Sequence, residues 1–169
     1  MARITLAVAL MVLHGAAHAQ VAPDTESPKA SVRLLLDPDP MVEVKSSDTT
    51  GIEVELSRGQ LIHLETMAED GGSGIASAQL VVHVRASCRS ASGLTSMRES
   101  VWKRDNADPG LPFKRNAAID INLAREVGGL CGAAKLVAAE LVATGRAVDD
   151  AGNVTTTPGL VLLLPERAS

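Results

Sequence analysis

Short runs in which apolar and polar residues alternate recur along most of this chain, and no other feature limits its fold as strongly. Residues 52–56 read Ile-Glu-Val-Glu-Leu, and within residues 77–88 Leu80, Val82 and Val84 share one face. A period of two places successive side chains on opposite faces of a β-strand, one of them buried. Turn-forming residues separate such runs about every eight to twelve residues. The pattern predicts an all-β domain, either a sandwich or a barrel.

The expected strands can be placed from this alternation and from the turn signals between them. The segment 135–148 is rich in alanine, and its composition alone would tolerate a helix. A strand is expected there because the turn Asp149–Asn153 and two further β-prone segments follow it. Segment 124–134 contains three glycines and is expected to be irregular, with a single helical turn at most. The strand-like segments are Ser31–Leu36, Met41–Lys45, Ile52–Leu56, Leu61–Ala68, Ser77–Cys88, Arg98–Lys103, Ala117–Leu123, Lys135–Val148, Val154–Thr157 and Leu160–Leu164.

The beginning of the chain has the layout of a secretory signal peptide. Arg3 is followed by an apolar run over residues 4–13 and by Ala17-His18-Ala19. Cleavage after Ala19 would leave 150 of the 169 residues, the size of a single domain. Residues 20–30 are rich in proline and polar residues and are expected to form a flexible lead-in, followed by one domain over 31–169. We therefore expect a periplasmic or secreted protein.

The two cysteines, Cys88 and Cys131, are expected to form a disulfide. An exported chain folds in an oxidising compartment, and two thiols without a nearby histidine pair make a poor zinc site. The bridge would close a loop of 42 intervening residues. The loop-entropy model assigns such a bridge about 4 kcal/mol of stabilisation.

Charge and hydropathy argue against two classes of partner. Without Arg3 the chain has 15 basic and 20 acidic residues, so no overall charge attracts nucleic acid or an anionic membrane. The leader's apolar run and Leu160–Leu164 are both too short for a membrane-spanning helix. We expect neither nucleic-acid binding nor a membrane span.

Two turn segments carry a resemblance to a known family. Ala68–Ile75 is similar to an Ala-x-Asp-x-x-Ser-Gly-Ile loop, and Ala147–Asn153 is similar to an Ala-x-Asp-x-Ala-Gly-Asn turn. Arg58-Gly59-Gln60 is a weaker match. Both motifs resemble those of bacterial immunoglobulin-like domains in envelope and surface proteins, and together they bracket residues 52–164. The resemblance implies an all-β, immunoglobulin-like two-sheet β-sandwich with roughly seven to nine strands in total.

The chain departs from antibody-type domains in ways that affect the disulfide. It has no tyrosine for a tyrosine corner, and Trp102 lies outside the usual layout between sheet-bridging cysteines. Cys131 precedes the penultimate strand instead of lying within it. We therefore expect the disulfide to join a loop to a strand.

A basic and aromatic segment is the candidate contact surface. Residues 98–115 are expected to be largely a loop. They contain five basic residues, Arg98, Lys103, Arg104, Lys114 and Arg115. Such a loop could attract an anionic glycan, a lipid head group or an acidic protein face. In the alternative interpretation, one ring packs in the core and the charges are merely solvated. The candidate binding residues are Trp102, Lys103, Arg104, Phe113, Lys114 and Arg115.

Other constellations offer weaker chemistry. Asp70, Asp149 and Asp150 could join a calcium site, but calcium requires six to eight oxygen ligands. His63 and His83 would approach each other only in a direct hairpin, and the immunoglobulin-like topology places them in different sheets. Gly72-Ser73-Gly74 lacks the spacing of a nucleophile elbow. We expect no catalytic residues, no metal and no cofactor.

The sequence therefore predicts an exported, non-catalytic module for binding, adhesion or structural support in the cell envelope, with a protein or a surface glycan as partner. The alternatives are a small secreted hydrolase and a calcium-dependent surface module.

Overall fold

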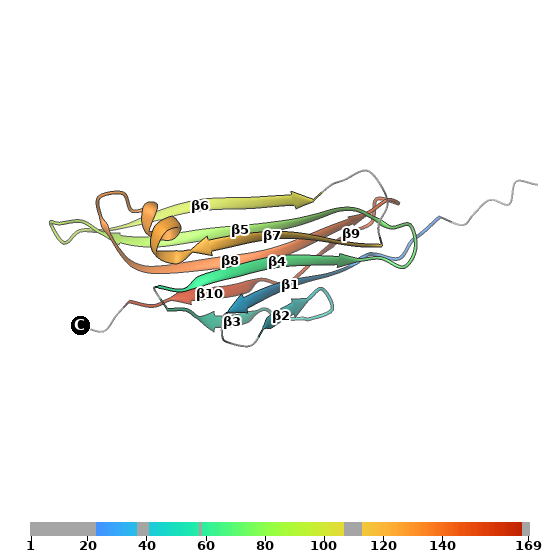
Figure 1. Ribbon diagram of the computed structural model, residues 1–169, viewed down its shortest axis with the longest axis horizontal. Helices are drawn as coiled ribbons and strands as arrows, with labels where there is room; N and C mark the ends of the chain where they lie inside the picture. The colour runs from blue at the N-terminus through green and yellow to red at the C-terminus, as the bar shows by residue number, and fades with distance from the viewer. Residues whose placement is uncertain (1–22, 37–40, 58, 107–112, 167–169) are drawn as a thin grey trace, which may run out of the picture.

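The protein consists almost entirely of β-strands arranged in two sheets (Figure 1). The structure is a computed structural model that describes residues 23–36, 41–57, 59–106 and 113–166. The leader 1–19 and the middle of the basic loop, 107–112, lie outside these residues. The strands are β1 (Lys29–Leu36), β2 (Val42–Lys45), β3 (Ile52–Glu55), β4 (Leu61–Glu69), β5 (Ile75–Arg89), β6 (Thr95–Asn106), β7 (Lys114–Asn122), β8 (Lys135–Asp149), β9 (Val154–Thr156) and β10 (Leu160–Leu164).

Four strands form one sheet in the order β2-β1-β4-β7, and the other sheet has the order β3-β10-β8-β5-β6, with β9 paired to β8. All pairs are antiparallel except β3 with β10. The predicted all-β, two-sheet architecture is confirmed. Each predicted strand segment overlaps a strand, including the alanine-rich β8, and the described residues form ten strands where roughly seven to nine were predicted.

The largest difference in boundaries concerns β6. A strand was predicted over Arg98–Lys103, with a loop after it, but β6 extends from Thr95 to Asn106. Its residues are exposed or half-buried along its whole length, so neither face shows an apolar period. Because the alternation signal depends on burial of one face, it underestimates a strand that is exposed on both.

The core lies between the inner faces of the sheets. Val82 and Val84 of β5, Leu141 of β8, and Ile62 and Leu64 of β4 are at most 2% exposed. These residues occupy alternate positions on their strands, as the period of two requires. The sheets approach closely at Gly145 of β8, where a Cβ atom would overlap Thr66 Oγ1 and lie 2.9 Å from Val32 Cγ2.

The connection between β7 and β8 contains the helical turn η1 (Leu123–Val127). Asn122 caps it, its side-chain oxygen accepting the Arg125 N–H at 3.0 Å. Leu123 and Val127 are buried against the core. Shortly after η1, Cys131 is bonded to Cys88 near the end of β5, with 5.5 Å between their Cα atoms. The predicted disulfide between a loop and a strand is confirmed.

The described part of the lead-in is packed against the domain. Pro28 is buried, and β1 begins at Lys29, two residues before the expected domain boundary. The Asp24 carboxylate accepts the Ser73 N–H at 2.8 Å, and the Asn153 side-chain amide donates to the carbonyls of Asp24 and Glu26 at 3.2 and 3.1 Å. Asp24 and Glu26 of the expected lead-in are therefore bonded to the two motif loops. Long-range polar contacts of this kind leave no local signal in a proline-rich sequence.

Candidate functional site

The six candidate binding residues do not lie together on one loop. Trp102, Lys103 and Arg104 belong to β6, Lys114 and Arg115 belong to β7, and Phe113 directly precedes β7. β6 and β7 are the end strands of different sheets on the same side of the sandwich, where the Asn106 side chain donates to the Asn116 carbonyl at 2.7 Å. Residues 98–106 and 114–115 of the expected loop belong to strands.

Arg115 has a structural position. Arg115 is 7% exposed, and its Nε donates to the Ile75 carbonyl at 2.8 Å. One of its terminal nitrogens donates to Asn106 Oδ1 at 3.3 Å. The guanidinium thus links β7 to β5 and β6 within the sandwich, and we remove Arg115 from the candidate contact residues. Inward- and outward-facing arginines cannot be distinguished by composition.

Phe113 and Lys114 form a second group at the beginning of β7. Phe113 is 58% exposed, and the Lys114 ammonium lies 2.8 Å from the Glu69 carboxylate. This ammonium holds the pKa of Glu69 below its ordinary value. Lys114 is therefore already paired on the surface, although such exposed pairs contribute little stability.

Trp102, Lys103 and Arg104 line a groove between the two end strands, which we call the β6–β7 groove. Its volume is about 590 Å³, and its lining residues are Val101, Trp102, Lys103, Arg104, Ile119, Asp120, Glu126 and Leu130. Trp102 is half-buried and packs against the core, so one face of the groove is apolar. Two basic and two acidic side chains surround that face.

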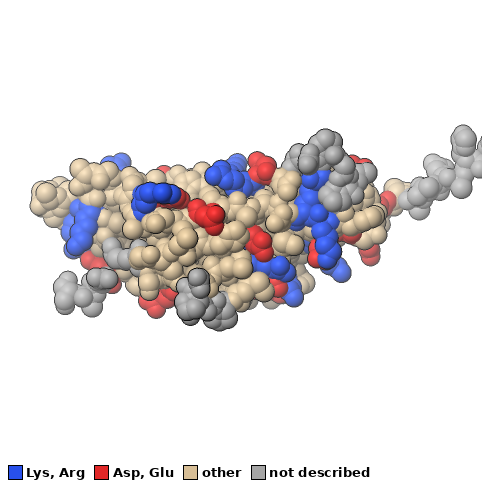
Figure 2. Space-filling view, in the orientation of Figure 1, with Lys and Arg blue, Asp and Glu red and all other residues tan. Residues whose placement is uncertain are grey.

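Four of these lining residues lie outside the predicted contact segment 98–115. Ile119 and Asp120 come from β7, and Glu126 and Leu130 come from η1 and the segment after it. They meet β6 only because the chain crosses between sheets, and no local spacing predicts that meeting. The mixed charge also differs from the expected positive patch. On the face shown in Figure 2, basic and acidic side chains are interspersed and do not form one region of a single sign.

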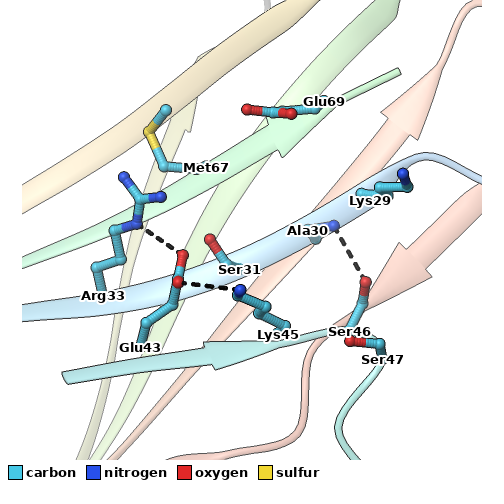
Figure 3. A pocket seen from close by; sticks show the side chains of 10 residues that line it. All are labelled: Lys29, Ala30, Ser31, Arg33, Glu43, Lys45, Ser46, Ser47, Met67 and Glu69. Atoms are coloured by element: carbon cyan, nitrogen blue, oxygen red, sulfur yellow. Dashed lines mark hydrogen bonds and ion pairs between the residues drawn. The ribbon is translucent and has the colours of Figure 1, made fainter. Parts of the chain in front are cut away.

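A second hollow, of about 430 Å³, lies over β1, β2 and β4 (Figure 3). Arg33 lines one side of it (Figure 3), 2.8 Å from Glu43 and 3.6 Å from Glu65, while Lys45 is 3.6 Å from Glu43. Burial raises the pKa of Glu43, but hydrogen bonds from Arg33 and Ser31 outweigh it and the pKa lies below its ordinary value. Arg33, Glu43 and Lys45 already form ion pairs, so a ligand in this hollow would have to displace them.

The two histidines lie in different sheets, as the topology argument expected. His63 is on β4 of the four-stranded sheet and His83 is on β5 of the other. His63 Nδ1 lies 2.7 Å from Asp120 Oδ1 across the β4–β7 pair. The residues opposite His63 on its two neighbouring strands are Leu35 and Asp120. Neither side chain carries a hydroxyl or a thiol that the His63–Asp120 pair could activate as a nucleophile.

Three carboxylates converge at the end of the sandwich formed by the two motif loops. Oxygens of Asp24, Asp70 and Asp149 lie within 4.8 Å of one another, and Asp149 is 1% exposed. Each carboxylate already accepts backbone N–H groups, from Ser73 for Asp24, from Gly72 and Gly74 for Asp70, and from Asn153 for Asp149. The N–H groups of Glu26 and Ser73 and the Ser73 hydroxyl lower the pKa of Asp24. These hydrogen bonds shape the loops, and this role explains why aspartates occupy these positions.

Comparisons with known proteins add little to this description. No family model matches the chain, and no curated protein matches it. A crystal structure of the ApaA protein from Bordetella pertussis is similar over 85% of this chain and 96% of that chain, at 12% identity and a TM-score of 0.27. A TM-score this low does not establish a shared fold, so we take neither fold nor function from it. Within the described residues, no helix has the length and apolar character needed to cross a membrane.

Proposed function

We propose that this protein is an exported, non-catalytic module with an immunoglobulin-like sandwich, which binds a protein partner in the cell envelope through the β6–β7 groove. The order of strands supports the immunoglobulin-like assignment. β4 and β7 are neighbours in one sheet, while β10, β8 and β5 are consecutive neighbours in the other. In immunoglobulin domains the second and fifth strands lie in one sheet, and the third, sixth and seventh lie in the other. With β4, β5, β7, β8 and β10 taken as the second, third, fifth, sixth and seventh strands, this chain has the same arrangement.

Export is supported by the predicted leader and by the disulfide. The Cys88–Cys131 bridge suits an oxidising compartment. N-terminal sequencing of the mature protein is expected to begin at or near Gln20, and recovery of intact Met1 from the envelope fraction would contradict export.

The observation that carries the binding proposal is the composition of the groove. A half-buried Trp102 provides apolar contact area, and charged side chains of both signs, Arg104 and Glu126 among them, surround it. A central aromatic with a charged rim is typical of protein interfaces. Glycan platforms usually stack sugars on several flat rings, and this chain has two aromatic residues in total. A protein partner therefore fits the groove better than a glycan.

The test compares two single variants of the full mature protein. Arg104→Ser removes a positive charge from the groove. Lys114→Ser removes a positive charge from the ion pair with Glu69, outside the groove, and is the matched control. Each protein is immobilised, and the envelope proteins that it retains are identified and then tested as purified partners. A partner bound by the parent and by Lys114→Ser, but about tenfold more weakly by Arg104→Ser, is the expected result. Equal binding by all three would remove the groove from consideration.

A further inference from the structure

The end strand β6 has backbone hydrogen-bonding groups that no other described segment uses. It pairs with β5 alone, in continuous register from Arg89 opposite Thr95 to Ala78 opposite Asn106. The short end strands β2 and β3 have four residues each, whereas β6 has twelve and contains no proline. Long exposed end strands present rows of unpaired N–H and C=O groups that another strand can join.

The register shows which residues direct these groups outward. The Ser90 N–H donates to the Leu94 carbonyl at 2.9 Å, next to the Arg89–Thr95 pair. Hydrogen-bonded and non-hydrogen-bonded pairs alternate along an antiparallel ladder. The even-numbered residues of β6 therefore bond to β5, and the odd-numbered residues direct N–H and C=O away from the sheet. The outward set is Thr95, Met97, Glu99, Val101, Lys103 and Asp105. The Lys103 carbonyl accepts a hydrogen bond from the Arg104 guanidinium at 3.3 Å, so the incoming strand would displace this exposed contact.

The side chains of β6 select the strand that fits this edge. We propose that β6 pairs antiparallel with β6 of a second copy of this chain, about a two-fold axis at Val101, joining two sheets into one. In this register Glu99 faces Lys103 of the second copy, and Lys103 faces Glu99 of the second copy. A shift by two residues in either direction places Glu99 opposite a valine or opposite Asp105, so both attractive pairs are lost.

The charges on the outer face of the sheet favour this register. Arg85 lies between Glu140 and Glu99 on neighbouring strands, at 3.6 and 3.0 Å. Lys103 of the second copy continues this row, so the charges alternate in sign across four strands. Lys103 forms no ion pair within the described residues of its own chain. Opposite charges facing each other across strands are stabilising, each by up to about 1 kcal/mol.

The same pairing covers exposed apolar area. Val101 is 47% exposed, and the two-fold axis places it against Val101 of the second copy. On the inner face Arg98 faces Arg104 of the second copy, and this like-charge pair opposes the register. Asp120 and Glu126 line the same groove as Arg104 and add negative charge near it. Val101 and Lys103 also line the β6–β7 groove, so dimerisation and partner binding share these two residues. Sedimentation of the purified protein alone reports dimerisation without any other partner.

Charge reversal provides the first test. Sedimentation of the mature protein at low salt is expected to show a concentration-dependent dimer. Glu99→Lys and Lys103→Glu each convert both attractive pairs into repulsive ones and should weaken dimerisation by at least about tenfold. The double variant restores opposite charges and should recover dimerisation close to that of the parent. A parent that stays monomeric at high concentration, or a double variant no better than the singles, would overturn the proposal.

Cross-linking provides a second test that reports the register. A hydrogen-bonded antiparallel pair has Cα atoms about 5.5 Å apart, which suits a disulfide. Val101→Cys is expected to form a covalent dimer under mild oxidation, with the 101–101 linkage identified by mass spectrometry. Leu61→Cys, at a 61% exposed position on β4, is the control and should remain largely monomeric. Equal cross-linking of the two variants would exclude the proposed register.

Discussion

β8 and β6 belong to the same sheet with only β5 between them, yet their surroundings differ. β8 alternates between buried and partly exposed residues along its length, and β6 has no buried residue. The four-stranded sheet covers β8, whereas β6 lies at the border of its sheet (Figure 1). Both segments have strand geometry, so the difference in burial comes from the four-stranded sheet, which packs over β8 and leaves β6 at the border. Substitutions should therefore cost much in β8 and little in β6.

The largest expected effect is a loss of stability when Leu141 of β8 is truncated. Leu141 is 0% exposed, so Leu141→Ala removes buried methyl groups and leaves a cavity. The free energy of unfolding should fall by about 3 kcal/mol. Val101→Ala in β6 is the matched truncation at a 47% exposed position and should change it by less than about 0.5 kcal/mol.

Urea denaturation of both variants, with the disulfide intact, measures the two values. Similar losses would mean that β6 is covered by something under the conditions of the measurement. Because dimerisation through β6 would provide such a cover, the comparison should be made at protein concentrations at which the parent is monomeric.

The same contrast explains how far the sequence predicted the fold. β8 was predicted to within one residue at its C-terminal end, despite an alanine-rich composition, because the turn at Asp149–Asn153 and the β-prone segments after it argue against a helix. β6 was predicted over six of its twelve residues. Periodicity reports burial of one face, and an end strand exposed on both faces produces none. The disulfide was predictable from compartment and cysteine count.

The candidate site was less predictable than the fold. The sequence identified Trp102 and Arg104, which do line the groove, but grouped them with Arg115, which is buried. It did not find Glu126 or Leu130, because these residues reach the groove through η1. Nor did it place Asp24 beside Asp70 and Asp149. Such groupings depend on which strands become neighbours, and this information is not local in sequence.

A second prediction concerns the close approach of the two sheets at Gly145 of β8. A methyl group at this position would overlap Thr66 Oγ1 and crowd Val32 Cγ2. Gly145→Ala should therefore lower the free energy of unfolding by about 2 kcal/mol, through overpacking. Gly128→Ala is the control, because Gly128 has helical angles and no atom within 4 Å of an added Cβ. It should be neutral or slightly stabilising.

A double variant tests the assigned cause. Thr66→Ala removes the hydroxyl that meets the new methyl group, so adding it to Gly145→Ala should cost less than the two single losses together. Additive losses in denaturation experiments would show that the strain at Gly145 arises elsewhere.

The smallest expected effects have opposite signs at two threonines beside Gly145. Thr66 Oγ1 is buried and has no hydrogen-bond partner among the described residues, whereas Thr157 Oγ1 accepts the Gly145 N–H at 2.9 Å. Both residues are at most 5% exposed, so replacing each by valine changes the shape little and exchanges a hydroxyl for a methyl group. Thr66→Val removes an unsatisfied buried hydroxyl and should raise the free energy of unfolding by about 1 kcal/mol. Thr157→Val leaves the Gly145 N–H without an acceptor and should lower it by about 1 kcal/mol.

The sign of the difference between these two variants is the decisive measurement, because each serves as the shape control for the other. Denaturation at constant pH with unchanged m-values would confine the effect to the folded state. If Thr66→Val is as destabilising as Thr157→Val, the Thr66 hydroxyl has a partner in solution, and an ordered water between the sheets would be the first candidate.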